Sequence, residues 1–391
     1  MKKIFLIFIV SALSFSAISQ TYFPGNTYFD STGYVEYRAG NLPIIISVPH
    51  GGTLEPSSIP DLSCNGTPSG FIDSYTKEIA EGLYATFFQE TGCYPHIIFN
   101  LLHKKKFQAN GNLHDAACGN PTVEEAWYNY HDFIDAAKTQ VIQDYNRGLF
   151  LDIHGHAHTI ERIELGYLLS KSELQLSDSI LNTNTYVEES SIRKLVSDNV
   201  QNYTHSELLR GQYSFGTLMD LKGFPSVPSF SDPFPQGSEP YFTGGYNTQR
   251  HGSRDNNGEI DDIQIEFNQD IRFDPGMRAL LIDSLISSIN EYINYHYNNQ
   301  FMDNYCGLII GGTEQEKVEL KLYPNPTTDY FYLSGQINNA ELIILNSFGQ
   351  EVLSEQWSNE RIKIKHLPAG LYFVKIVKNN ITMEIIKLIK E

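Results

Sequence analysis

Residues 43–52 read PIIISVPHGG, an unbroken apolar run that ends in His50 and two glycines. Residues 148–156 read GLFLDIHGH, a second run of the same kind that delivers His154. Continuous apolar runs of this length indicate strands that are buried on both faces of a parallel sheet. Ligands of such open sheets bind beyond the carboxyl ends of the strands. We therefore expect His50 and His154 to lie together at one edge of an α/β sheet.

Helix and strand patterns alternate on either side of these two runs. Apolar spacing predicts helices at 72–90, 123–145 and 277–297, and strands at 97–102, 166–170 and 260–267. Residues 21–42 are expected to be an irregular lead-in, and residues 172–240 a polar region with short helices at 190–200 and 206–211. Alternation of this kind implies right-handed crossovers. The predicted fold is a three-layer αβα sandwich around a mixed, mostly parallel sheet, of the phosphorylase/hydrolase-like type.

Both ends of the chain carry patterns of their own. Residues 1–20 combine two lysines, an apolar core and a stretch of small residues, which is typical of a secretory signal peptide. No later segment reaches the roughly 18 apolar residues that a membrane span needs. Residues 303–316 are interpreted as a linker, and residues 317–391 as short alternating strands separated by turns, which predicts a small Ig-like β-sandwich. Residues 21–302 would then form the main domain.

Charge and cysteine content limit the partners. The formal net charge is −18, and the acidic excess lies in the first 316 residues, because residues 317–391 carry 9 Lys or Arg against 8 Asp or Glu. An acidic surface repels nucleic acid and anionic membranes, so we expect neither as a partner. The cysteines lack CxxC spacing and are expected to form one or two disulfides in an exported protein, with three connectivities open. They are Cys64, Cys93, Cys118 and Cys306.

Two imidazoles that meet at the end of a sheet predict a metal site, and a hydrolytic zinc site needs three protein ligands and an open position. Asp73, at the start of the first predicted helix, is the expected third ligand, with Glu55 and His156 as reserves. The alternative for Asp73 is an ordinary first-turn acid that the helix dipole favours. Asp152, two residues before His154 on the same side of the strand, is expected to hold the ring. We expect one Zn²⁺, although imidazole and carboxylate suit other divalent ions.

Glu266 lies in the apolar run of residues 263–267 (IQIEF). A carboxylate is unfavourable there unless it is paired with an opposite charge or has a chemical role. Beside a metal it would be the general base that takes a proton from the attacking water. The alternative is a buried salt bridge. The glycines after His50, Gly51 and Gly52, are expected to let a substrate approach closely.

Residues 43–298 resemble the N-formylglutamate amidohydrolase family, whose fold is similar to that of zinc carboxypeptidases. The shared segments are SVPHGG, FIDSYTKEIAEGL, LHKKK with Asn110, LDIHGH and IQIEFN. The resemblance implies that His50, an acid near Asp73 and His154 hold zinc, and that Glu266 is the catalytic base.

One segment, residues 102–111, departs from the family pattern, a run resembling LHRKKLDxNR. Lys104, Gln108 and Gly111 stand where the family has Arg, Asp and Arg. Arginine clamps a carboxylate through two hydrogen bonds and lysine does not, so formylglutamate itself is not the expected substrate. Lys104 and Arg250 are expected to help stabilise the developing oxyanion. The residues expected to contact substrate are Asn110, Gly51, Gly52 and His251.

The tail resembles the C-terminal sorting domain of type IX secretion cargo in Bacteroidetes. The matching segments are LYPNP (322–326), NSFGQ (346–350), LPAGLY (367–372) and the basic end of the chain. This resemblance implies engagement with the type IX secretion machinery and export across the outer membrane, followed by release or surface attachment. It carries no information on chemistry.

The leading interpretation is a secreted zinc-dependent hydrolase that acts on a small-molecule or peptide amide. Export favours extracellular amide substrates over amino-acid catabolism in the cytoplasm. A second interpretation is a catalytically degenerate protein that binds peptide or glycan in the former active-site cleft. A third is a lectin-like or adhesion protein that uses the Tyr- and Phe-rich loops between residues 203 and 246.

Overall fold

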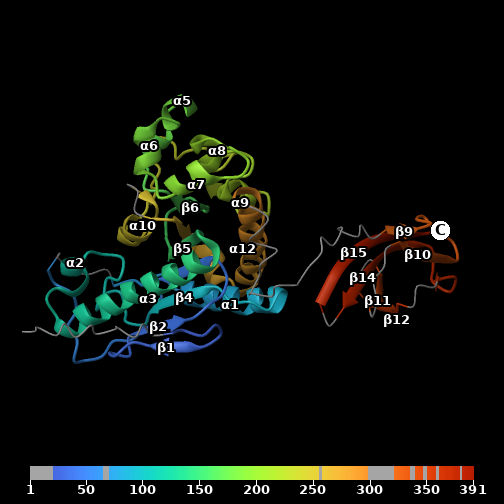
Figure 1. Cartoon of the computed structure of the whole chain (residues 1–391), viewed down its shortest axis with the longest axis horizontal. Coiled ribbons are helices and arrows are strands. Elements are labelled where there is room, and N and C mark those ends of the chain that lie inside the picture. The colour runs from blue at the N-terminus through green and yellow to red at the C-terminus, as the bar shows by residue number, and fades with distance from the viewer. Residues whose placement is uncertain are drawn as a thin grey trace, which may run out of the picture. The chain divides into compact units, whose positions relative to one another are not determined.

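The computed structural model describes residues 21–64, 70–254, 258–297, 321–334, 340–346, 350–357, 361–378 and 381–391. The chain folds as two compact units, Met1–Leu308 and Ile309–Glu391, drawn in Figure 1. The predicted signal peptide and the predicted linker lie outside the described residues. Within the described part of the chain, every helix is too short or too polar to cross a membrane.

The first unit is built on an eight-stranded sheet of order β1-β2-β4-β3-β5-β8-β6-β7. Neighbouring strands are parallel from β4 through β3 and β5 to β8, whereas β2 and β6 run antiparallel to their neighbours β4 and β8. The predicted mixed, mostly parallel sheet is confirmed. The strands are β1 (Thr27–Phe29), β2 (Val35–Arg38), β3 (Ile44–Val48), β4 (His96–Asn100), β5 (Gly148–Gly155), β6 (Ile163–Gly166), β7 (Ser226–Val227) and β8 (Ile260–Phe267).

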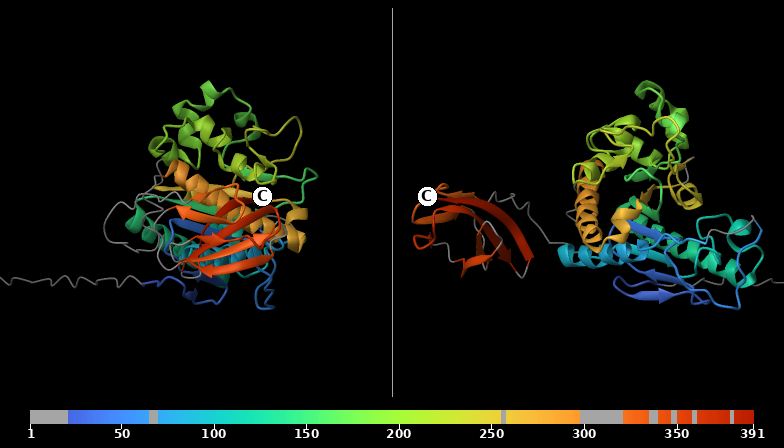
Figure 2. Two further views of the ribbon diagram at one scale, coloured as in Figure 1. Left: turned by 90° about the vertical axis from the view of Figure 1, so that its right-hand side faces the viewer. Right: turned by 180° about the vertical axis from the view of Figure 1, so that it is seen from behind.

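Helices cover both faces of this sheet. The long helices α1 (Thr76–Thr91) and α12 (Pro275–His296) pack on one face, and α3 (Pro121–Tyr145) and the short α10 (Tyr246–His251) pack on the other. Short helices between β6 and β7 gather at the top of this unit in Figures 1 and 2. The shorter helices are α2 (Leu113–Ala117), α4 (Lys171–Leu174), α5 (Asp178–Leu181), α6 (Asn184–Glu189), α7 (Arg193–Asp198), α8 (His205–Arg210), α9 (Phe215–Asp220) and α11 (Gln269–Phe273).

Alternation along the central strands separates apolar from polar side chains, since successive residues of a strand point to opposite faces. In β5, Leu151 and Ile153 belong to the core under α1 and α12. Asp152 and His154 point to the opposite face, together with Phe150, which packs in the core under α3. Strand β8 repeats the pattern, with isoleucines on the α1 side and Glu266 on the α3 side. Polar groups therefore collect on one face, toward the carboxyl ends of the strands.

Three local expectations are wrong. Residues 21–42 are not an irregular lead-in, because β1 and β2 extend the sheet there and Val35 and Tyr37 are buried in its core. The short strand expected at 166–170 lies earlier, at Ile163–Gly166, and Leu168 has a φ of 64°, which no regular strand accommodates. Helix α1 begins at Thr76 instead of residue 72, after Tyr75 with a φ of 67°.

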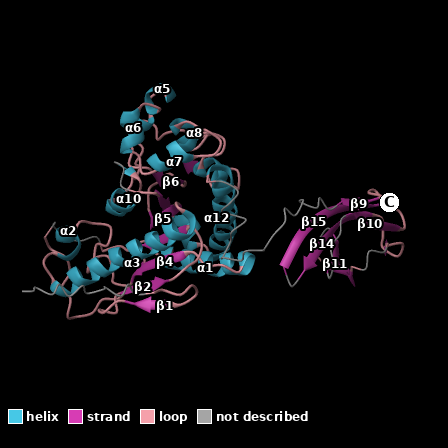
Figure 3. Cartoon of the chain, viewed as in Figure 1, coloured by secondary structure: helices cyan, strands magenta, loops and turns pink. Residues whose placement is uncertain are grey.

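The second unit is all-β in its described part, as the magenta strands of Figure 3 show. It has a three-stranded sheet of order β13-β10-β9 and a four-stranded sheet of order β12-β11-β14-β15, both antiparallel. The side chains of β12 are largely exposed. The strands are β9 (Lys321–Tyr323), β10 (Tyr330–Ser334), β11 (Ala340–Asn346), β12 (Glu351–Gln356), β13 (Ile362–Lys363), β14 (Gly370–Lys378) and β15 (Ile381–Lys390).

A disulfide joins Cys64 to Cys118 across 54 residues of chain. Cys93 is also disulfide-bonded, and Cys306 lies outside the described residues. The expectation that the cysteines form disulfides instead of binding metal is confirmed for Cys64, Cys93 and Cys118.

Candidate metal centre

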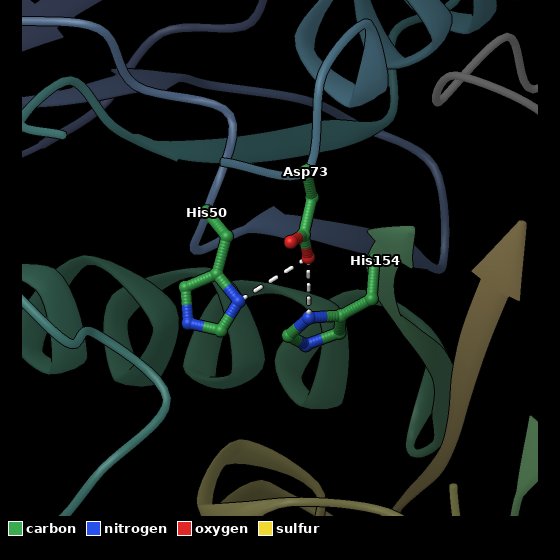
Figure 4. Close-up of side chains that lie close together, drawn as sticks. All are labelled: His50, Asp73 and His154. Atoms are coloured by element: carbon green, nitrogen blue, oxygen red, sulfur yellow. Dashed lines mark hydrogen bonds and ion pairs between the residues drawn. The ribbon is translucent and has the colours of Figure 1, made fainter. Parts of the chain in front are cut away.

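Three predicted ligands meet at the carboxyl edge of the sheet. His50 follows β3, His154 lies near the end of β5, and Asp73 precedes α1. Figure 4 shows the Asp73 carboxylate between the two imidazole rings. Its Oδ2 atom lies 3.2 Å from His50 Nδ1 and 3.1 Å from His154 Nδ1. The backbone fixes this meeting, because the Asp73 N–H donates to the carbonyl oxygen of His50 at 3.1 Å.

The donor set fits a zinc ion. His50, Asp73 and His154 are 4%, 7% and 2% exposed, and one ligand atom of each lies within 4.8 Å of the other two. Tetrahedral zinc with bonds of about 2.0 Å separates neighbouring ligand atoms by about 3.3 Å, close to both contacts of Asp73. Two imidazoles and one carboxylate leave a fourth position open, which is the composition of hydrolytic zinc sites.

Each imidazole is held through its second nitrogen. His154 Nε2 lies 2.9 Å from Asp152 Oδ2, as the sequence predicted. Asp152 in turn accepts hydrogen bonds from the Ser47 hydroxyl and from the Asn247 amide. His50 Nε2 contacts the side-chain oxygen of Gln108. Metal-binding histidines are oriented by such partners, which leave the other ring nitrogen free for the metal.

Charges around the group favour a cation. Although burial opposes ionisation, His50 and His154 hold the pKa of Asp73 well below its usual range. Burial also works against a charged His154, but Asp152 and Asp73 raise the pKa of this ring well above its ordinary value. A cation at Nδ1 would replace the proton that these carboxylates attract, because metals and protons compete for the same nitrogen. For His50, burial and then Lys104 lower the pKa to about 4, which keeps the ring neutral.

Glu266 stands beside the three ligands on the neighbouring strand. The register of β5 and β8 pairs it with His154, and the Gln264 amide donates to its Oε1 at 3.0 Å. Burial, with Asp73 and Glu164, raises the pKa of Glu266 to about 8, against the opposing effects of His154 and Lys104. A carboxyl group with a pKa near neutrality is suited to proton transfer.

Two further predicted residues lie in contact with the ligands. Lys104 Nζ is 3.7 Å from Asp73 Oδ1, and the Asn110 amide nitrogen is 3.1 Å from His154 Nε2. Asn110 is itself held by the N–H of Asn247 at the start of α10. Lys104, Gln108 and Asn110 thus reach the ligands from one loop after β4.

Arg250 and His251 lie elsewhere, on α10 beside α3. Arg250 is near Asp135 and lies over the Trp127 ring, and the His251 ring packs at a tilt against Phe150. Phe150 precedes His154 by four residues of extended strand, about 13 Å. The expectation that Arg250 acts as a clamp beside the metal and His251 contacts substrate is therefore not met. Helix α10 instead presents Asn247, one turn earlier, to the site.

Gly51 and Gly52 pack closely against the protein's own chain. A β-carbon on Gly52 would lie 2.4 Å from the backbone carbon of Leu101, and one on Gly51 would lie 2.9 Å from Thr76. Glycine is required at both positions by this packing, and substrate contact there stays a prediction.

The reserve ligands do not join the group. Glu55 pairs with Lys105 at 2.6 Å on the surface. His156 Nε2 is bonded to the carbonyl oxygen of Arg162, and its Nδ1 accepts from the N–H of His158.

Arg272 of α11 is a supporting residue that the sequence did not reveal. Its buried guanidinium donates to the carbonyl oxygens of Ser74, His156 and Phe267 at 2.7, 2.9 and 3.0 Å. It thereby joins the segment after Asp73 to the ends of β5 and β8. Nothing in the local pattern around residue 272 signals this role, because all three partners are backbone atoms and two of them, in Ser74 and His156, are distant in sequence.

Comparisons with solved structures give several similar chains. One is N-formylglutamate amidohydrolase from Ralstonia eutropha JMP134, with 11% identity over 70% of this chain and 98% of that one, and a TM-score of 0.40. Another is a proposed carboxypeptidase A of Shewanella denitrificans OS-217, with 10% identity over 66% of this chain and 60% of that one, and a TM-score of 0.32.

A third similar chain is PorZ, a bacterial surface component of the type IX secretion system of Porphyromonas gingivalis. The match has 16% identity and a TM-score of 0.18, covers 21% of this chain and spans only 12% of PorZ. No curated protein matches the chain. Residues 321–391 match the family model described as the secretion system C-terminal sorting domain, which assigns the tail of this chain to that family.

Proposed function

We propose that the chain is a secreted zinc-dependent hydrolase that cleaves amide or peptide bonds. The observation that carries the proposal is the buried group of His50, Asp73 and His154 with Glu266 on the adjoining strand. The resemblance of residues 43–298 to the N-formylglutamate amidohydrolase family points the same way.

The side chains divide the work of hydrolysis. Zinc held by His50, Asp73 and His154 would supply a Lewis acid that lowers the pKa of water to about 7 and polarises the substrate carbonyl. Glu266 is the base that takes a proton from the attacking water. The Lys104 ammonium, 3.7 Å from Asp73, lies close enough to help neutralise charge that develops on the carbonyl oxygen.

The substrate is an amide whose recognition does not depend on a bidentate carboxylate clamp. Lys104 presents a point charge where the resembled family has arginine, and Arg250 is directed toward α3. Asn110 is the remaining polar group at the ligands, and it supplies neutral hydrogen bonds. These features support a peptide or other extracellular amide over formylglutamate.

A second candidate function is non-catalytic binding of peptide or glycan in the same cleft. The observation in its favour is the neutral Gln108 against His50, where the resembled family has an acid. A neutral partner makes the imidazole a weaker ligand, and a chain without zinc would retain only the cleft.

The chain's arrangement fits an exported enzyme. We propose that residues 1–20 direct export and are followed by a hydrolase domain at 21–302, a linker at 303–316 and a sorting domain at 317–391. The match of residues 321–391 to the sorting-domain family supports engagement with the type IX secretion machinery. The product would be released or held at the cell surface.

The test is metal content together with turnover for the purified chain. We expect one zinc per wild-type chain, none in His154→Ala, and an unchanged content in His114→Ala, whose histidine is exposed. Glu266→Gln should keep its zinc and lose turnover on a panel of peptide and acyl-amide substrates. A wild-type chain that takes up no zinc would refute the hydrolase, and a zinc-loaded chain that binds peptide without turnover would favour the second function.

A further inference from the structure

A loop carries a second histidine pair over the end of the strand that bears Glu266. Strand β5 ends at Gly155, and β6 begins at Ile163 on the far side of β8. The connecting residues therefore cross the carboxyl end of β8. The crossing is anchored where it starts, because the N–H of His156 donates to the carbonyl oxygen of Phe267 at 2.9 Å.

Glu164 is the residue of β6 that faces Glu266. The two are paired in the antiparallel register of β6 and β8, and Glu266 is paired with His154 in the register of β8 and β5. Paired residues of adjacent strands point to the same face, with β-carbons about 5 Å apart. His154, Glu266 and Glu164 thus form a row across three strands, and Glu266 is in the middle.

Both carboxylate oxygens of Glu164 have a hydrogen-bond partner. Oε1 lies 2.8 Å from His158 Nδ1, and Oε2 accepts from the N–H of Phe242 at 2.9 Å. Glu164 is 0% exposed. A fully buried carboxylate is stable only when it is paired, and the imidazole of His158 is the group that pairs it.

His158 has the geometry of a positioned proton donor. Its ring stacks on Phe242 with centroids 4.8 Å apart, and Glu164 fixes Nδ1, so the orientation of the ring is set from two sides. Its side chain remains 22% exposed. Nε2 has no hydrogen-bond partner in the described part of the chain, which leaves this nitrogen for a ligand.

The same loop, together with the start of β6, also places His156, His158 and Glu164 within reach of a single metal ion. His156 argues against that use, since both of its ring nitrogens are bonded to backbone groups, Nε2 to the Arg162 carbonyl and Nδ1 to the His158 N–H. Without His156, two ligand groups remain, and they are already bonded to each other. The pair is better suited to proton transfer.

We propose that His158, oriented by Glu164, is the general acid that protonates the leaving amine in the hydrolysis proposed above. A substrate carbonyl over His154 and Glu266 would extend its nitrogen toward the Glu164 side of the row. The proposal rests on that hydrolytic function. Glu164 touches no reacting atom and acts as a positioning residue.

The proton transfers balance. As the C–O bond forms, the attacking water gives one proton to the Glu266 carboxylate. As the C–N bond breaks, the leaving nitrogen takes a proton from His158 Nε2. The proton on Glu266 then returns through solvent to His158, so that one amide and one water yield one acid and one amine.

The test compares two substrates of wild type and His158→Gln. One is a peptide amide, whose leaving nitrogen needs a proton, and the other is the matching nitrophenyl ester, whose leaving group does not. We expect kcat for the amide to fall about 10²–10³-fold and kcat for the ester to change less than about threefold. Zinc content should stay that of wild type. Glu164→Gln should show the same selective loss in smaller measure, and His114→Gln, at an exposed histidine, should show none.

Each other outcome is decisive. Equal losses on both substrates, or no loss on the amide, would overturn the acid role while leaving the proposed hydrolase standing. A fall in zinc content in His158→Gln would make His158 a metal ligand and would also overturn it. A zinc-loaded wild type that cleaves neither substrate would refute the hydrolytic function and the acid role together. This outcome is recognised from the wild-type protein alone, whereas the others appear only when the variant is compared with an active wild type.

Discussion

Replacement of Asp152 by asparagine should weaken zinc binding without changing the shape of the site. Asp152 is completely buried, and its Oδ2 lies 2.9 Å from His154 Nε2. Asparagine has nearly the same shape but carries no charge. It therefore keeps a hydrogen bond to the ring and removes the carboxylate that makes the imidazole a strong ligand.

The size of the effect follows from this one contact. A hydrogen bond to a charged group contributes about 1.5–3 kcal/mol and a neutral one about 0.5–1.5 kcal/mol. The difference between the midpoints of these ranges, about 1.3 kcal/mol, corresponds to about a tenfold weaker zinc affinity. Loss of an outer partner of a metal-binding histidine usually weakens affinity by about 10–100-fold. We expect Asp152→Asn to fall in this range.

The chain supplies a matched control in Asp262, which is equally buried on the same face of β8, opposite Phe150 of β5. Asp262→Asn makes the same change of side chain four positions before Glu266, the residue of β8 that is paired with His154. Burial, followed by Asp152, raises the pKa of Asp262 well above its usual range, so the change removes less charge than Asp152→Asn does. Zinc affinity would be measured at pH 8.5 by competition with a chromogenic chelator. An Asp152→Asn affinity within threefold of wild type, or an equal loss in Asp262→Asn, would refute the reasoning.

Three more results are expected. Glu266→Gln should flatten the loss of stability that the metal-free protein shows between about pH 4.5 and pH 8. Burial raises the pKa of Glu266 from its ordinary value of 4.5 to about 8, so in this range the carboxyl ionises in the unfolded state but stays protonated in the folded state, and the folded state loses stability as the pH rises. Thermal melts with chelator from pH 5 to 9 check this, and parallel curves for the variant and wild type would contradict it. Joint replacement of Cys64 and Cys118 by serine should lower the free energy of unfolding by about 4 kcal/mol, because the disulfide closes a loop of 54 residues in the unfolded chain. Denaturant titrations measure this loss, and a loss under about 1 kcal/mol would argue against the prediction. Gln108→Glu should raise the zinc affinity about tenfold, because it gives the His50 imidazole a charged partner, and Gln108→Ala should lower the affinity. Both are measured in the chelator assay, and an unchanged affinity in both variants would show that residue 108 does not act on the His50 ring.

Four polar residues of the candidate site were predictable because each is marked by a local pattern. His50 and His154 end long apolar runs, and strands of that kind bring their carboxyl ends to one edge of a parallel sheet. Glu266 is conspicuous as a charge within an apolar strand. Asp152 shares a face with His154 because two residues separate them. None of these inferences required knowledge of which strand lies next to which.

Partners supplied by loops and short helices were harder to predict. Gln108 looked like the loss of an acid, yet its oxygen still contacts His50. Arg250 and His251 looked like site residues because they precede β8, but α10 turns them toward α3 and presents Asn247 instead. A helix of six residues has no periodicity from which its buried side could be read.

The sequence by itself determined the central strands β3, β4, β5 and β8, the face on which their polar residues lie, the histidines and glutamate at their ends, and the sorting domain of the tail. Those features depend on alternation and spacing over a few residues, which the chain encodes locally. Only the tertiary structure decided that β8 lies between β5 and β6, and that Glu266 therefore has His154 on one side and Glu164 on the other. Strand order and the path of loops result from packing between segments far apart in sequence, and no local pattern records that packing.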